Sequence, residues 1–155
     1  MYLIEAGETN RKIFYIASGL VRSFKIRVRQ GQEEEVNTCF FFDGELTGSL
    51  YRSMSSIPAD SYLQTLEPTR LWVTNASLLR EVFKRYPQLY ELSSDFDNQI
   101  LTKCNAIPDM LRLPTARERY RFMLQHFPKL KRIKQKDIAS FLGVGEQRLS
   151  KILHS

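Results

Sequence analysis

The pattern of hydrophobic and polar positions divides the chain into a β-rich first half and a helical second half. Ranges rich in β-branched and aromatic residues, with partial alternation, cover residues 12–17, 20–29, 36–42, 61–66 and 70–74. Turn-forming residues such as Gly, Asp and Ser separate them. Many short strands with turns at this spacing predict an antiparallel sandwich or jelly roll.

The second half carries helical spacing instead. A first helix is expected to start at residues 75–77 and to stop at Pro87, and a longer one is expected over about 88–107. Proline lacks a backbone N–H, so Pro108 should kink or end the second helix. Thr115 and Glu118 have the spacing of a capping box, which predicts a further helix that Phe127-Pro128 closes.

The long helix carries an apolar stripe at spacings of four, four, four and three residues. Such a stripe is most often the buried face of a helix on its own domain. It can also pair with the same stripe of a second copy of the chain, and we predict that pairing here. The stripe consists of Leu92, Phe96, Ile100, Cys104 and Ile107.

The last twenty residues before the C-terminal serine, QKDIASFLGVGEQRLSKILH, predict a helix-turn-helix over 135–154. Ala139 is small where two helices must approach closely, and Gly143 stands where the chain must turn with a positive φ. Apolar residues at the spacings that bury one face of each helix are Ile138, Leu142, Val144, Leu149 and Ile152. An ordinary two-helix hairpin would show part of this pattern, but all positions in register favour DNA binding.

The charge distribution supports the DNA-binding prediction. The chain has 155 residues and a formal net charge of +6. The range 112–155 holds 11 Lys/Arg and 3 Asp/Glu, whereas 1–111 holds 12 and 14. All the excess positive charge therefore lies around the predicted helix-turn-helix, as phosphate contacts require. A solvated basic surface is the alternative interpretation.

Several function classes find no support in the sequence. No apolar run is long enough to span a bilayer and the N-terminus lacks the apolar core of a signal peptide, so we expect a cytoplasmic protein without membrane contact. Cys39 and Cys104 are too few for a four-thiolate or iron–sulfur site and are expected to be reduced. His126 and His154 lie near no suggestive partner. We therefore expect no metal, no cofactor and no catalytic site.

The order of parts resembles the Crp/Fnr family of bacterial transcription regulators, in a version like those of Bacteroidetes-type bacteria. The resemblance covers nearly the whole chain and rests on EAGETNRKIFYIASGLVRSF at 5–24, FFFDGELTGS at 40–49, TARERYRFMLQHFP at 115–128 and the helix-turn-helix. Family members usually carry a helix and a strand before the first segment, so we expect this chain to be N-terminally shortened.

The resemblance implies an α+β fold with three parts. These are an antiparallel β-roll (jelly roll) of the effector type over 1–87, a long dimerisation helix with a hinge over 88–113, and a helix-turn-helix DNA-binding domain over 114–155. The implied partners are double-stranded DNA, a second copy in a homodimer, RNA polymerase, and an unidentified small-molecule effector.

The resemblance also assigns the DNA contacts by position. The first residues of the recognition helix reach base edges, so Gln147 is expected to pair with adenine and Arg148 with guanine or phosphate. Glu146 either accepts from a cytosine amino group or only favours the helix dipole. The expected DNA-binding set is Gln135, Lys136, Gly145, Glu146, Gln147, Arg148, Ser150 and Lys151.

The effector cassette departs from the cyclic-nucleotide pattern. Gly44, Glu45 and Leu46 match its Gly-Glu-Leu start, and a turn glycine with a solvated carboxylate is the alternative interpretation. The Arg-Ser/Thr-Ala step that neutralises the cyclic phosphate falls on Ala59, Asp60 and Ser61, so its arginine is missing. Arg52 is the nearby substitute. A buried anion without a cation is disfavoured, and we expect no response to cyclic AMP.

Two other function classes remain for comparison. A sensor or regulatory subunit could use the β-roll alone to bind a small molecule, without specific DNA binding. An enzyme of the similarly shaped cupin type would need histidine ligands, and the β region contains no histidine.

Overall fold

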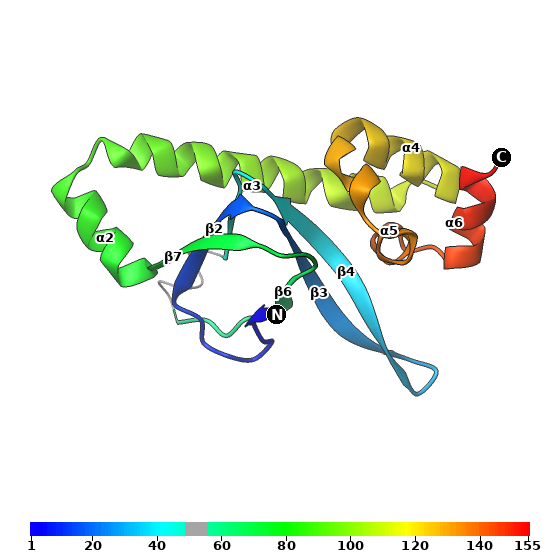
Figure 1. Cartoon of the computed structure of the whole chain (residues 1–155), viewed down its shortest axis with the longest axis horizontal. Helices are drawn as coiled ribbons and strands as arrows, with labels where there is room; N and C mark the ends of the chain where they lie inside the picture. Colours follow the sequence, from blue (N-terminus) through cyan, green and yellow to red (C-terminus); the bar gives the residue numbers. More distant parts are fainter. Residues whose placement is uncertain (49–55) are drawn as a thin grey trace.

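The computed structural model describes residues 1–48 and 56–155, and within them it contains two antiparallel sheets followed by helices (Figure 1). The first sheet has the strand order β1-β6-β3-β4 and the second has the order β5-β2-β7. The strands are β1 (Tyr2–Ile4), β2 (Lys12–Ser18), β3 (Leu20–Arg29), β4 (Gln32–Phe42), β5 (Leu46–Thr47), β6 (Tyr62–Thr65) and β7 (Arg70–Asn75). The predicted α+β class and antiparallel β-roll are confirmed.

The β3–β4 hairpin is the longest ladder of the molecule. It runs in register from Leu20 opposite Phe42 to Arg29 opposite Gln32, with a bulge between Ser23 and Phe24. The half nearest Leu20 is buried, whereas the half nearest the turn is exposed and extends away from the body (Figure 1). The expected strand over 36–42 was therefore too short, because the charged residues 33–35 continue the ladder in solvent.

Two helices follow the β-roll. Asn75 caps α2 (Ala76–Arg85), as expected, by accepting from the Ser77 backbone N–H at 3.0 Å. The long helix α3 (Leu89–Arg112) continues through Pro108. Of the two expected outcomes, an end at Pro108 is wrong, and a kink there stays a prediction. Pro108 and Cys104, whose carbonyl would have bonded the missing N–H, are both exposed, so water can satisfy that carbonyl.

The C-terminal part contains four short helices at one end of α3 (Figure 1). They are α4 (Ala116–His126), η1 (Pro128–Arg132), α5 (Gln135–Leu142) and α6 (Glu146–Leu153). The predicted capping box is present: the Thr115 hydroxyl accepts from the Glu118 N–H, and the Glu118 carboxylate accepts from the Thr115 N–H. α4 ends at Phe127-Pro128, also as predicted.

The hydrophobic core consists of two clusters, and the larger one joins the β-roll to the C-terminal helices. Leu20, Phe40 and Phe42 come from the β-roll and pack into the same cluster as side chains of α3 to α6. The rings of Phe40 and Phe141 meet edge to face at 5.4 Å. The expected division at residue 114 is therefore crossed by one continuous core.

Candidate nucleic-acid interface

The helix-turn-helix is built around a tight turn at Gly143. This residue has φ 65° and caps α5 by donating to the carbonyls of Ala139 and Ser140. Val144 then donates to the Ala139 carbonyl at 3.0 Å, which closes the turn. Ala139 of α5 is buried, and Leu149 is fully buried on the inner side of α6. These positions agree with the sequence prediction and hold the two helices as one unit.

The outward face of α6 carries the predicted base-reading side chains. Glu146, Gln147 and Arg148 are exposed in its first turn, and Lys151 is exposed one turn later. Gly145 is the N-cap and offers no side-chain acceptor, so the first N–H groups of α6 point outward without a side-chain partner. Such a helix start suits contact with a phosphate.

One of the predicted contact residues is already engaged within the protein. The Gln135 side-chain amide donates to the Glu146 carbonyl at 3.3 Å, so it ties the start of α5 to the start of α6. Ser150 is half-buried on α6. Lys136 is exposed beside Gln135.

The excess positive charge of the C-terminal part divides into engaged and available groups. Arg119 donates to the carbonyls of Leu113 and Leu142, and Arg132 bridges the Gly19 carbonyl and Glu67. Among the described residues of this part, the exposed basic side chains that make no hydrogen bond or ion pair are Arg121, Lys131, Lys134, Lys136, Arg148 and Lys151.

The predicted dimerisation stripe does not lie on one exposed face of α3. Ile107 packs against the chain's own core, and Phe96 and Ile100 line a cavity between α3 and the β-roll. Leu92 and Cys104 are exposed, and Leu92 also lines the cavity. In the single chain the stripe is thus only partly exposed, and its pairing with a second copy stays a prediction.

A second apolar set on α3 is exposed instead. Tyr90, Leu101, Cys104 and Leu111 are exposed in the single chain, although Leu101 also contributes to the lining of the cavity. Leu101, Cys104 and Leu111 follow one another at spacings of three and seven residues, which keeps them near one side of a helix. These apolar positions were visible in the sequence. The stripe predicted at spacings of about four residues instead follows the side of α3 that faces the cavity and the core.

The effector candidates separate into two places. Leu46, Asp60 and Ser61 line the cavity, which measures about 980 Å³. Gly44 and Glu45 do not line it: the Glu45 carboxylate accepts from the Phe42 N–H at 2.9 Å and from Lys103 at 2.6 Å. The Glu45 side chain is 28% exposed and has partners within the chain, and its role toward an effector stays a prediction. Arg52 lies outside the described residues.

The chemistry of the cavity lining is apolar and lacks cations. Its described lining residues include no lysine or arginine, and they include the carboxylates Asp60 and Asp97. Ala59 lines it at the place where the family pattern has arginine. Asp60 forms an ion pair with Lys25 at 3.2 Å. The buried Thr47 hydroxyl lines the cavity without a hydrogen-bond partner.

The described residues contain neither a helix that could span a membrane nor a group of side chains that could hold a metal ion. None of the helices there is both long and apolar enough to cross a membrane. In the same residues no three His, Cys, Asp or Glu side chains gather where they could hold a metal ion.

Comparisons with known proteins identify the fold. By sequence the chain matches no family model and no curated protein. By structure it is similar to FixK2 from Bradyrhizobium japonicum, at 18% identity and a TM-score of 0.79, over 99% of this chain and 78% of that one. A transcriptional regulator of the CRP family from Thermus thermophilus matches at 14% identity, TM-score 0.73, over 99% and 79%.

A third similar structure is the c-di-GMP responsive global regulator CLP from Xanthomonas campestris. It shares 15% identity and a TM-score of 0.72 with this chain, over 99% of this chain and 81% of that one. The chain thus has the fold of Crp/Fnr regulators over nearly its whole length, at an identity that establishes fold alone.

Proposed function

We propose that this chain is a sequence-specific DNA-binding transcription regulator of the Crp/Fnr type that acts as a homodimer. The observation that carries the proposal is the recognition helix α6. It rests on a buried Leu149 and presents Glu146, Gln147 and Arg148 outward. Side chains of this type at the start of an exposed helix suit base edges in the major groove.

The surrounding charge supports the same function. Lys136 and Lys151 flank the reading face, and neither makes a hydrogen bond or ion pair. Cations that are not paired within the protein can release counterions from DNA, which gives affinity and salt dependence. By analogy with the similar regulators, cytoplasmic double-stranded DNA is the partner, and RNA polymerase a further one.

A homodimer would supply the second recognition helix. One helix reads too few base pairs, and a two-fold axis repeats it on a symmetric site with half-sites about one helical turn apart. The exposed set of Tyr90, Leu101, Cys104 and Leu111 on α3 is the face proposed for this contact. The stripe predicted from the sequence, which includes Phe96, Ile100 and Ile107, is the alternative contact face.

Selection of bound duplexes from a random library, followed by titration of the best site, tests the proposal. Arg148→Ala should cost roughly 1–3 kcal/mol and relax the preference at one base pair. Lys136→Ala should weaken all sequences alike and flatten the salt dependence. Arg80→Ala, an exposed arginine on α2, is the matched control and should change neither. Binding that ignores both salt and sequence would contradict the function.

A second candidate function is favoured by the cavity. The unpartnered Thr47 hydroxyl, in a mostly apolar lining whose described residues include no lysine or arginine, suits an uncharged small molecule with one polar group. The β-roll would then act as a sensor, alone or as the effector domain of the regulator. Loss of affinity for a bound molecule in Thr47→Val, with DNA binding absent in the unchanged protein, would favour the sensor alone.

A further inference from the structure

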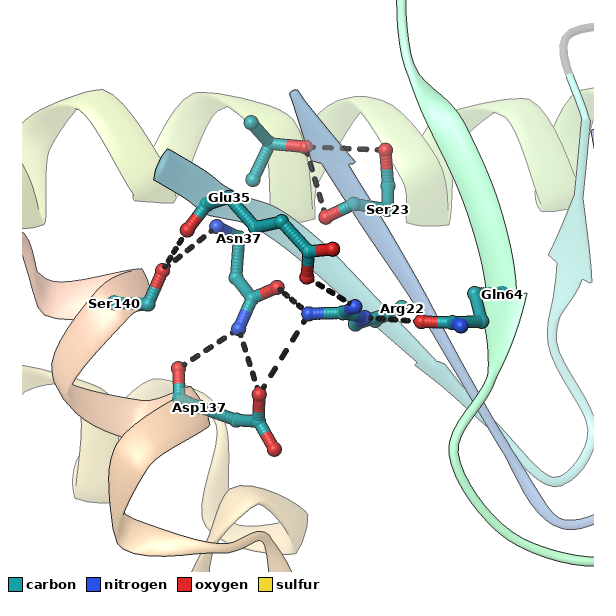
Figure 2. Close-up of polar contacts among 8 residues, drawn as sticks. Arg22, Ser23, Glu35, Asn37, Gln64, Asp137 and Ser140 are labelled. Atoms are coloured by element: carbon teal, nitrogen blue, oxygen red, sulfur yellow. Dashed lines mark hydrogen bonds and ion pairs between the residues drawn. The ribbon is translucent and has the colours of Figure 1, made fainter. Parts of the chain in front are cut away.

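A buried polar cluster links the β-roll to the first helix of the helix-turn-helix. It consists of Arg22 on β3, Asn37 on β4 and Asp137 on α5, which are 7%, 4% and 7% exposed. Arg22 Nη1 donates to Asn37 Oδ1 at 3.1 Å, and Asn37 Nδ2 donates to the Asp137 carbonyl at 3.1 Å and to its carboxylate at 3.3 Å. Figure 2 shows these side chains converging between the hairpin and α5.

A second link lies beside the polar cluster. The Ser140 hydroxyl of α5 accepts from the Asn37 backbone N–H at 3.0 Å and donates to the Glu35 carbonyl at 3.1 Å (Figure 2). Asp137 and Ser140, three residues apart on α5, therefore both contact Asn37 of β4. A rotation or a slide of α5 by one residue would break both links together.

The apolar contact next to the cluster cannot by itself fix this orientation. Phe40, Phe42 and Phe141 bury area, and burial of apolar area is favourable in many orientations. Hydrogen bonds require distances near 3 Å and a narrow range of angles. The cluster therefore supplies the directional part of the interface, and the apolar core supplies most of its free energy.

The partners of the cluster are distributed unequally between the two sides. Arg22 also donates to Gln64 at 2.8 Å and pairs with Glu35, both in the β-roll. Asp137 lies 3.7 Å from Arg22 Nη1. If α5 moved away, Arg22 would keep its β-roll partners and Asp137 would regain water. The cluster can thus hold α5 in place, and the free-energy cost of releasing α5 stays moderate because neither charged group would be left buried without a partner.

We propose that Arg22, Asn37 and Asp137 are positioning residues that set the angle of the recognition helix relative to the β-roll. The proposal rests on the DNA-binding function above. Because Gly143 and the buried Leu149 hold α5 and α6 together, fixing α5 fixes α6. In a symmetric dimer the angle of each α6 sets the distance between the two, and therefore the half-site spacing that both can reach.

An exchange of charge between two of the residues tests the cluster. Asn37→Asp places a second carboxylate against that of Asp137 and should release α5. Adding Asp137→Asn returns one carboxylate and one amide to the pair and should restore much of the contact. Thr38→Val is the matched control, because the Thr38 hydroxyl lies next to Asn37 in β4 but bonds only Ser23 of the β-roll.

The distance between the two parts is measured first, without DNA. Spin labels at Lys12→Cys on β2 and His154→Cys after α6, in a Cys104→Ser background, report the orientation; the buried Cys39 thiol stays unlabelled. With the labelled chain diluted in an excess of unlabelled chain, so that a dimer carries one labelled copy, the unchanged cluster and Thr38→Val should give one narrow distance distribution. Asn37→Asp should broaden or split it, and the double variant should narrow it again.

The preference for one half-site spacing in DNA binding is a second measurement, and a general loss of stability would not change it selectively. On duplexes whose half-site spacing differs by a base pair, the unchanged protein should prefer one spacing by about tenfold, because both helices must engage together. Asn37→Asp should lose most of that preference while keeping salt-dependent non-specific binding. The double variant should regain it.

The two readouts separate the two proposals. An unchanged protein with a narrow distance that binds no duplex contradicts the proposed function alone. An Asn37→Asp protein that keeps both the narrow distance and the spacing preference overturns the positioning role. If Asn37→Asp does not fold, Asp137→Ala serves instead, because Arg22 then keeps Glu35 and Gln64. It should broaden the distance distribution, and a narrow one would overturn the proposal.

Discussion

The two sides of the β-roll differ sharply in how they are covered. Phe40 in β4, at the end that meets the C-terminal helices, is 2% exposed and sits in a core shared with α5. Trp72 in β7, in the other sheet, is 70% exposed, and the cavity opens beside it. The packed end holds α5 in place. The open end contains the cavity, so the proposed roles of orienting α6 and of binding a small molecule would fall to different parts of one β-roll.

Cysteine reactivity should show the largest effect, as a contrast between Cys39 inside the β-roll and Cys104 on the exposed surface of α3. Burial raises the pKa of the Cys39 thiol from 9.0 to about 12, because desolvation disfavours the thiolate. Cys104 is exposed. At pH 8 alkylation of Cys39 should be slower by about a thousandfold or more than that of Cys104, since only the thiolate reacts. Mass spectrometry of timed reactions measures both rates.

The same shift has a consequence for stability. The folded state holds the Cys39 proton more tightly than the unfolded state, so stability should fall as pH rises from about 9 to about 12. Cys39→Ala removes this titration and serves as the control. In the alkylation experiment, equal rates at the Cys39 and Cys104 thiols would show that the structure around Cys39 opens readily.

Truncation of core aromatics should give the next largest effect. Phe141→Ala removes a ring from the shared core and should lower the free energy of unfolding by roughly 3–5 kcal/mol. Trp72→Ala removes an exposed ring and should change it by about 0.5 kcal/mol or less. Urea denaturation compares the two. A large loss in Trp72→Ala would mean that β7 is covered in solution.

A charge placed on the exposed side of α3 should weaken the proposed dimer. Leu101→Lys places a cation in the proposed dimer contact and should raise the dissociation constant on the order of a hundredfold, about 3 kcal/mol. Asp95→Lys introduces the same residue at another exposed position of α3 and should have a small effect. Sedimentation measures both. A monomeric unchanged protein at high concentration would remove this face from consideration.

The smallest expected effect is that of cyclic nucleotides, because we expect neither cyclic AMP nor cyclic GMP to bind in the cavity. The cavity has no cation among its described lining residues to meet a cyclic phosphate, and losing that contact costs on the order of 3–5 kcal/mol, by analogy with a broken buried ion pair. Calorimetry should detect no binding of cyclic AMP or cyclic GMP. Micromolar binding that Arg52→Ala abolishes would show that Arg52 supplies the missing charge.

Local signals in the sequence predicted most of the elements correctly. The Thr115–Glu118 capping box, the helix start at residues 75–77 and the positive φ of Gly143 are confirmed, because each depends on neighbours within a few residues. β1 and β5 were missed. They contain three and two residues, too few for a periodic pattern, and they form only because longer strands pair with them.

The exposed α6 face at Glu146, Gln147 and Arg148 was also determined by sequence alone, since helical spacing decides which side chains oppose a buried Leu149. Tertiary structure decided the rest. Glu45 pairs with Lys103, and Asn37 meets Asp137 across 100 residues. Such contacts depend on how the β-roll and α5 pack, and no local periodicity records which face of one element meets which face of another.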